Sequence, residues 1–304
     1  LVGVGGGSSL DIARQMSVFA ATGRSLDDLR AEARETGAVD LEEPADPLTP
    51  VVVVPTTFAG ADLSAGGSIE VLAAEASPTP HPVRTSGSNW PVAAVYDPDL
   101  FETTPQSALA GSAMNGFNKG IETPYARTAT PISDATAAHG LGFLGDGLGR
   151  IGAGEREGEA MERAVVGAVL VQFERRVSIV HAFGHGFSRR YDVQQGDVHA
   201  VVVPHVLRYL FGKVDGNRHL LANGLGVDTD GMDDDAVAAA VVGEVERVRD
   251  ALDLPTRLRD LTGTRKEHLP DIAEFILEDP PMAQAPADLD PTAAELEGVL
   301  RDAW

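Results

Sequence analysis

The sequence predicts a chain of two parts, an α/β part up to residue 104 and an all-helical part from residue 105 to the end. Up to residue 104, short apolar runs are each followed by a turn rich in glycine or hydroxyl residues, which is the pattern of buried strands in an α/β sheet. After it, alanine-rich segments with helical apolar spacing dominate. Because 304 residues are enough for two hydrophobic cores, we assign 1–104 and 105–304 to separate domains.

The first turn of the chain has the composition of a phosphate-binding loop. A short apolar strand is followed by a glycine run and then by a helix, so the backbone can approach an anion at the helix N-terminus. The run lacks the spacing of the dinucleotide-binding fingerprint, and a plain glycine-rich turn is the alternative. The residues predicted to bind a cofactor here are Gly5, Gly6, Gly7, Ser8, Ser9 and Asp11.

Further strands follow in the first part. Residues 25–50 are acidic and predict a solvated helix followed by a loop. The run 51–54 predicts a buried strand, and Thr56 and Thr57 follow directly at its carboxyl end, where open α/β sheets bind ligands. We therefore expect both threonines to contact a cofactor, with turn or capping chemistry as the alternative. Residues 68–72 and 93–96 predict two more strands.

The second part predicts amphipathic helices almost throughout. Residues 279–291 are rich in proline and aspartate and predict a loop before the last helix. The predicted helices are 106–125, 133–149, 157–182, 235–252, 267–278 and 292–303.

The charge balance excludes several classes of partner. The chain has 46 acidic against 24 basic residues, a net charge of −22, and only three lysines, so nucleic acid and anionic membranes would be repelled. An acidic, lysine-poor surface is typical of proteins in a cytoplasm of very high salt, where screening removes self-repulsion. The absence of cysteine excludes disulfides and thiolate metal sites. No apolar run has the length of a membrane span, and no signal peptide is visible.

Polar residues within the helical part form the candidate catalytic group. Asn115 and Lys119 are four residues apart and share a helix face. A segment carrying His181 and His185 and leading to Gln195 is the expected partner of that face. The alternatives for Lys119 are a surface lysine or a salt-bridge partner of Glu122, three residues on. The alternative for His181 and His185 is that they are interhelical histidines with satisfied hydrogen bonds.

Six motifs occur in one order along the chain: Gly5 to Asp11, Pro55 to Thr57, Tyr96 to Pro98, Met114 to Glu122, His181 to His185 and Val203 to His205. Together they resemble the iron-containing alcohol dehydrogenases of the dehydroquinate-synthase-like superfamily. The resemblance implies that fold, an NAD or NADP cofactor on the glycine loop, a substrate between the domains and a homo-oligomer. The family's nucleotide-binding domain begins well before its glycine loop, so we expect this chain to lack the first βαβ portion.

The resemblance fails at the metal. The family holds its ion with an Asp and a His four apart and with two His fourteen apart, and the matching positions here are Asn115, Lys119, His181 and Gln195. A protonated lysine cannot coordinate a metal, so we expect no metal of the usual kind at this site, with a weak site that uses the nearby His185 and His199 as the alternative. The loop from Pro55 to Ser64 and Asn115 are similar to the metal-independent maleylacetate reductase branch. We expect Phe58, Asp62 and His185 to contact substrate, with capping of its own loop as the alternative for Asp62.

These features predict an NAD(P)-dependent oxidoreductase that interconverts a small alcohol with an aldehyde, ketone or oxo acid. Lys119 would stabilise the carbonyl oxygen, and His181, Asn115 and Gln195 would complete the catalytic group. One alternative is a lyase in which Lys119 forms a Schiff base. Another is an inactive, truncated paralogue that acts as a binding or oligomerisation subunit.

Overall fold

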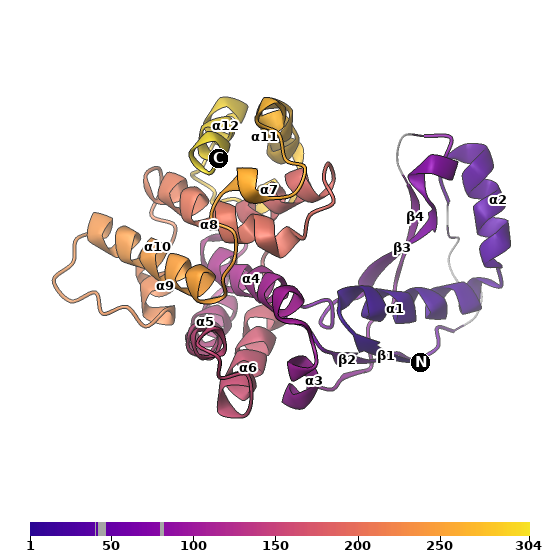
Figure 1. The fold of residues 1–304 in the computed structure, drawn as a ribbon, viewed down its shortest axis with the longest axis horizontal. Helices are drawn as coiled ribbons and strands as arrows, with labels where there is room; N and C mark the ends of the chain where they lie inside the picture. Colours follow the sequence, from indigo (N-terminus) through magenta and orange to yellow (C-terminus); the bar gives the residue numbers. More distant parts are fainter. Residues whose placement is uncertain (40, 42–46, 80–81) are drawn as a thin grey trace. The chain divides into compact units, whose positions relative to one another are not determined.

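The computed structural model describes residues 1–39, 41, 47–79 and 82–304. Contacts divide the chain into an N-terminal unit, Leu1–Phe101, and a C-terminal unit, Glu102–Trp304 (Figure 1). The division falls three residues before the boundary after residue 104 that the sequence indicates. The first unit contains the strands and the second is helical, as the sequence predicts.

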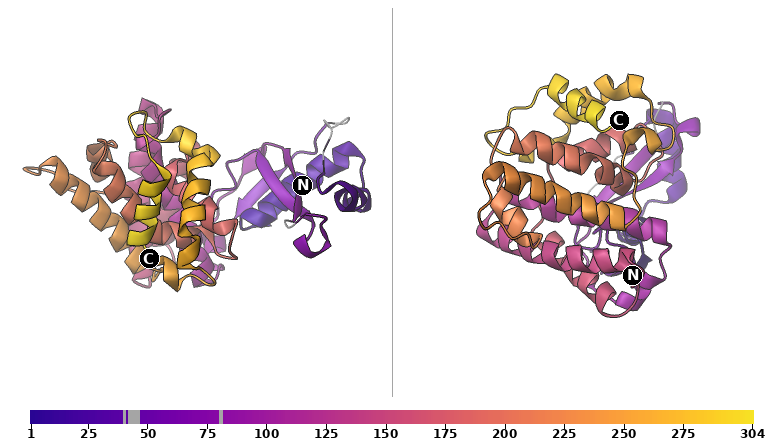
Figure 2. Two further views of the ribbon diagram at one scale, coloured as in Figure 1. Left: turned by 90° about the horizontal axis from the view of Figure 1, so that it is seen from above. Right: turned by 60° about the vertical axis from the view of Figure 1, so that its left-hand side comes forward.

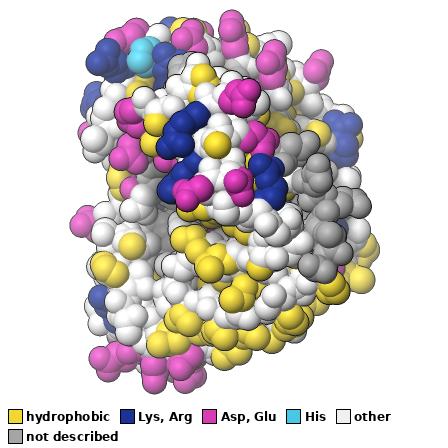
Figure 3. All heavy atoms as spheres, turned by 90° about the vertical axis from the view of Figure 1, so that its right-hand side faces the viewer, with side chains coloured by type: hydrophobic (Ala, Val, Ile, Leu, Met, Phe, Trp, Pro, Cys, Tyr) yellow, Lys and Arg dark blue, Asp and Glu magenta, His cyan; other side chains and the backbone are white. Residues whose placement is uncertain are grey.

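The N-terminal unit is built around a small parallel sheet. Its strands are, in spatial order, β1 (Val2–Gly5), β2 (Val52–Pro55) and β5 (Ala93–Ala94). Helix α1 (Gly7–Thr22) packs on one face, where Leu10 meets the buried Val53. On the other face Val2 is 66% and Val4 55% exposed. Figure 3, which shows the right-hand side of the Figure 1 view, has hydrophobic side chains gathered across its lower part.

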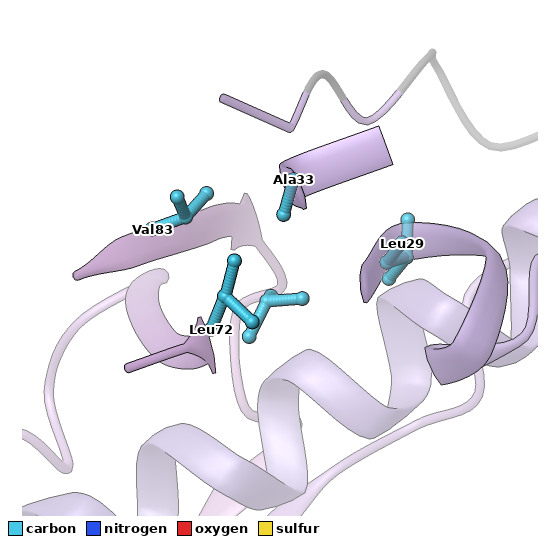
Figure 4. Packing of buried hydrophobic residues seen from close by; sticks show 5 residues of the cluster. Leu29, Ala33, Leu72 and Val83 are labelled. Carbon is cyan, nitrogen blue, oxygen red and sulfur yellow. The ribbon is translucent and has the colours of Figure 1, made fainter. Parts of the chain in front are cut away.

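A second sheet in this unit is antiparallel and pairs β3 (Gly66–Leu72) with β4 (Val83–Ser88). Helix α2 (Leu26–Thr36) lies over it, and its Leu29 and Ala33 pack against Leu72 and Val83 (Figure 4). The predicted helix within 25–50 is confirmed as α2, whereas part of the predicted loop lies at residues 40 and 42–46, outside the described residues. Strand β4 is a correction, since the sequence analysis assigned no strand there.

The C-terminal unit is a packed set of helices, with α5 and α6 side by side and α7 against α8 (Figures 1 and 2). A short helix, α3 (Pro98–Glu102), precedes them. The helices are α4 (Gln106–Glu122), α5 (Pro131–Gly152), α6 (Glu159–Phe173), α7 (Ile179–Ser188), α8 (Gln195–Phe211), α9 (Arg218–Gly224), α10 (Asp234–Ala251), α11 (Leu269–Glu278) and α12 (Ala293–Asp302).

The predicted helix 157–182 is wrong as a single element. The chain leaves the helical conformation at Glu174, and α7 begins after Ser178. Apolar spacing continues across the break, but the Glu122 side chain accepts hydrogen bonds from the backbone N–H groups of Ser178 and His181 and so caps a new helix. The break places His181 in the first turn of α7. Helices α8 and α9 are also additions to the predicted set.

Candidate active site

The glycine turn of the N-terminal unit, the predicted phosphate-binding loop, packs against the loop that follows β2. Gly5 ends β1 with a φ of +133°, a conformation that side chains other than glycine rarely adopt. A Cβ on Gly6 would lie 3.3 Å from Thr57 Cγ2, so the loop after β2 packs directly on the turn. The Thr56 N–H donates to the Gly5 carbonyl over 3.0 Å. The predicted cofactor residues of both loops are therefore neighbours, at the carboxyl ends of β1 and β2.

Helix α1 begins directly after this turn and has no side-chain cap at Gly6. The positive end of the helix dipole is thus available to an anion beside Ser8 and Ser9. Asp11, the remaining predicted member, accepts a hydrogen bond from Arg14 over 2.7 Å. Burial raises the pKa of Asp11, and the Arg14 charge opposes the rise. Its contact is to the protein's own guanidinium.

Two of the predicted substrate residues are held by the N-terminal unit itself. Phe58 is 1% exposed, and its ring centroid lies 5.0 Å from that of Phe101, so it fills the core. Asp62 is 2% exposed and accepts a hydrogen bond from the Tyr96 hydroxyl. Burial and the adjacent Asp62 raise the pKa of Tyr96. Both residues thus have structural partners, and their contact with a substrate stays a prediction.

In the C-terminal unit, α4 carries a buried polar stripe. Asn115, Asn118, Lys119 and Glu122 recur at three- and four-residue spacing and so share one face of the helix. Asn118 and Glu122 are fully buried, and Lys119 is 7% exposed. Polar groups are costly to bury, so a stripe of this kind inside a helical core indicates a site.

The predicted catalytic residues come together around this stripe. Lys119 Nζ donates to Gln172 Oε1 of α6 over 3.1 Å. Asn115 Nδ2 lies 3.5 Å from Gln195 Oε1, which is the long limit of a hydrogen bond. Gln172 was missed by sequence reasoning, because nothing in its own segment marks it.

His181 belongs to the same cluster and is held by Glu122. Its Nδ1 hydrogen-bonds to Glu122 Oε2, while its Nε2 is buried with no hydrogen-bond partner among the described residues. Burial, followed by the charges of Lys119, His185 and Arg175, lowers the pKa of His181 well below its usual range. The imidazole is therefore neutral near pH 7.

His199 on α8 is a further member that the sequence analysis did not assign to the catalytic group. It is fully buried, and its ring centroid lies 4.6 Å from that of His181. Within the described residues, neither of its ring nitrogens has a hydrogen-bond partner. Burial and the nearby His181, His185 and Lys119 lower its pKa. Its four-residue spacing from Gln195 on one helix was the signal available in the sequence.

His185 is bound elsewhere. Its Nδ1 lies 2.6 Å from Oδ2 of the buried Asp279, and its side chain is 33% exposed. Asp279 also lies 3.6 Å from Arg189. The ring is thus held by an acidic partner near α11 rather than by Glu122 or Lys119.

A model of the Fe-containing alcohol dehydrogenase family, C-terminal region, matches residues 109–304. The chain belongs to this Fe-containing alcohol dehydrogenase family. The family was expected from the motifs, and the match confirms it. The chain is therefore a member of a family of oxidoreductases. Lys119, His181 and His199 all lie within the matched region of this chain.

Relatives in the family extend over most of the chain. The chain is 28% identical over 283 residues to NAD-dependent methanol dehydrogenase of Bacillus methanolicus, covering 92% of this chain and 71% of that protein. It is 29% identical over 261 residues to maleylacetate reductase of Pseudomonas knackmussii, covering 84% and 67%. A crystal structure of 1,3-propanediol oxidoreductase has a TM-score of 0.82 at 22% identity, over 100% of this chain and 76% of that one. This confirms the predicted fold.

The family name implies iron, but the side chains of this member do not fit it. The four positions that match the family's ligands carry two amides, an ammonium and a single imidazole. The Lys119 ammonium lies inside this cluster, where it would repel a cation. Among residues 1–39, 41, 47–79 and 82–304, no group of three His, Cys, Asp or Glu is placed to hold a metal. We therefore derive no step through a metal ion.

A search for membrane spans among the described helices finds none that is both long and apolar enough.

Proposed function

We propose that this family member uses NAD or NADP to interconvert a small alcohol with an aldehyde, ketone or oxo acid, without a metal. The observation that carries the proposal is the buried Lys119, which shares one helix face with Asn115 and with Glu122, the residue that binds His181. The relatives support the reaction class, since they are named as dehydrogenases and reductases of small alcohols and carbonyls. A cytoplasmic location and a homo-oligomer are proposed on the resemblance alone.

The chemistry follows from where charge develops. When hydride passes from the reduced nicotinamide to the carbonyl carbon, negative charge builds on the carbonyl oxygen. A buried ammonium next to that oxygen is worth more than one in water, because the surrounding dielectric is low. Lys119 would stabilise the oxygen in place of a metal ion, and Asn115 and Gln195 would orient the substrate by neutral hydrogen bonds. Gln172 holds the Lys119 ammonium in position.

The cofactor would lie on the N-terminal unit. The nicotinamide coenzyme supplies the hydride when bound. Its pyrophosphate suits the N–H groups of the turn Gly5–Gly7 and the start of α1, and its ribose suits the hydroxyls of Thr56 and Thr57. The uncapped helix N-terminus supports this assignment.

The test is oxidation of NADH and NADPH in high-salt buffer with a panel of aldehydes and oxo acids, first in EDTA and then with added Fe²⁺ or Zn²⁺. We expect wild type to turn over in EDTA, and Lys119→Ala to lose about 100- to 1,000-fold in kcat, the usual effect of removing one oxyanion donor. Lys213→Ala is the matched control, because Lys213 pairs with Glu295 at the surface.

The remaining outcomes separate the alternatives. Turnover that depends on added metal would disprove the metal-free reaction. Covalent trapping of a carbonyl substrate on Lys119 by borohydride, without nicotinamide oxidation, would favour the Schiff-base lyase. Failure to bind either nicotinamide would favour the binding subunit.

A further inference from the structure

Glu122 is a buried acidic side chain that hydrogen-bonds to the first turn of α7 through both of its oxygens. It is the last residue of α4 and is fully buried. Its Oε1 accepts hydrogen bonds from the backbone N–H groups of Ser178 and His181, each at 3.1 Å. The carboxyl group therefore joins the end of α4 to the N-terminus of α7 and fixes where His181 lies relative to Lys119.

The other oxygen of Glu122 determines which nitrogen of His181 is left for the site. Oε2 hydrogen-bonds to Nδ1, so Nε2 points away from the carboxyl group. Burial raises the pKa of Glu122 to about 8, against the effect of the backbone N–H donors, and burial lowers the pKa of His181. These two directions favour an arrangement in which the Glu122 hydroxyl donates to Nδ1 and His181 carries its own hydrogen on Nε2.

We propose that Glu122 supplies, through His181, the proton that carbonyl reduction consumes. This inference rests on the proposed function. As hydride reaches the carbonyl carbon, the Nε2–H bond of His181 breaks and an O–H bond forms on the substrate. At the same time the Oε2–H bond of Glu122 breaks and an Nδ1–H bond forms. The products are the alcohol, the oxidised nicotinamide and a Glu122 carboxylate, which takes a proton from solvent before the next turnover.

The surroundings favour this route over one that leaves a charged imidazole. His181 is neutral before and after the step, which suits a buried ring whose pKa is lowered by burial and by the charge of Lys119. The negative charge that remains on Glu122 is accepted by the N-terminus of α7, where two backbone N–H groups already point at Oε1. The ionisable groups whose charges act on this pair are Lys119, Tyr125, Arg175, His185 and His199.

Glu122→Gln separates this role from simple support. The amide oxygen can still accept both backbone N–H groups, and the amide N–H can donate to Nδ1, so His181 keeps its orientation and its Nε2 hydrogen. Only the transferable proton is lost. Glu122 is thus a positioning residue that also donates a proton to His181. We expect Glu122→Gln to lower kcat about 100-fold, while the KM for the carbonyl changes less than about twofold.

Two comparisons make the kinetic test decisive. In a His181→Asn background, adding Glu122→Gln should lower kcat by less than about threefold, because the proton transfer through His181 is already lost. Glu295→Gln is the matched control, since Glu295 also accepts a backbone N–H at a helix start, in the capping box of α12, and it should leave kcat unchanged. A Glu122→Gln enzyme that keeps kcat within about threefold, or an undiminished loss in the His181→Asn background, would overturn the inference.

A second measurement covers failure of the variant to fold. With hydride transfer made rate-limiting, as checked with deuterated nicotinamide, kcat of wild type is measured in mixtures of H₂O and D₂O. Two protons moving together predict a curved dependence on the deuterium fraction. A straight line means a single proton, as from Lys119 directly, and overturns the inference. Wild type without any turnover would instead overturn the proposed function, and this inference with it.

Discussion

Gly184 on α7 makes room for the imidazole of His199 on α8. A Cβ built on Gly184 would lie 2.3 Å from His199 Nε2, closer than any real contact, so the two residues are complementary. Because His199 packs against His181, Gly184 indirectly determines where both rings lie. The buried cluster is therefore set as much by a missing side chain as by those present.

We expect Gly184→Ala to displace His199 and to lower kcat, with a loss of about 1–3 kcal/mol in the free energy of unfolding from overpacking. Urea unfolding and steady-state kinetics on the same preparation check this. Gly243→Ala is the control, because Gly243 lies within α10 with open space around it, and it should gain about 0.5–1 kcal/mol. Equal stability of the two variants would contradict the close packing at Gly184.

Phe58 provides a test between a core role and the predicted substrate contact. As a fully buried ring against Phe101, its replacement by alanine should cost about 3–5 kcal/mol of unfolding free energy. Phe173→Ala, at a position that is 68% exposed, should cost little. A Phe58→Ala protein of normal stability with a raised KM for the carbonyl would instead support the substrate contact.

The sequence predicted the order of elements well where periodicity and turns are local. The helix within 25–50 and the strand at 68–72 follow from such signals. The single helix 157–182 failed because its break is made by a residue far away, when Glu122 caps the start of α7. Strand β4 was missed because its sequence, Val83 to Ser88, is polar and small, and its pairing with β3 is tertiary.

The sequence predicts the part of the site that shares a helix face or a family motif. Asn115 and Lys119 lie four apart on α4, and the structure places both on its polar stripe, with Asn115 half-buried and Lys119 buried. Gln172 carries no signal in its own segment, and only packing brings it to Lys119. His199 has its four-residue spacing from Gln195, but its place beside His181 depends on the packing of α7 against α8. His185 shares a helix with His181, but Asp279 holds its ring from a distant segment.

The net charge of −22 leads to a prediction about salt. Self-repulsion among acidic residues opposes folding, and the Debye length falls from about 10 Å at 0.1 M to about 3 Å at 1 M salt. We expect Tm to rise by at least about 5 °C between 0.1 and 2 M KCl. Tm is measured by differential scanning fluorimetry in KCl and in sucrose. Only KCl screens charges, whereas sucrose stabilises proteins because it is excluded from their surface. A Tm that does not change with KCl would contradict the high-salt interpretation of the composition.

The raised pKa of Glu122 predicts a specific pH dependence of stability. Burial moves this pKa from 4.5 to about 8, so the folded state holds a proton that the unfolded chain releases. Its contribution to stability is complete below pH 4.5 and is lost as the pH rises through 8, with a slope of about 1.4 kcal/mol per pH unit between them.

The lowered pKa values of His181 and His199 have the opposite effect and make the protein more stable as the pH rises, because at these residues the unfolded chain binds more protons than the folded one. The informative quantity is therefore the difference in unfolding free energy between wild type and Glu122→Gln, from urea unfolding at pH 5.5, 6.5, 7.5 and 8.5. Wild type should lose stability relative to the variant up to about pH 8 and run parallel to it above. Parallel curves over the whole range would mean that Glu122 is already ionised when buried, and that His181 receives no proton from it.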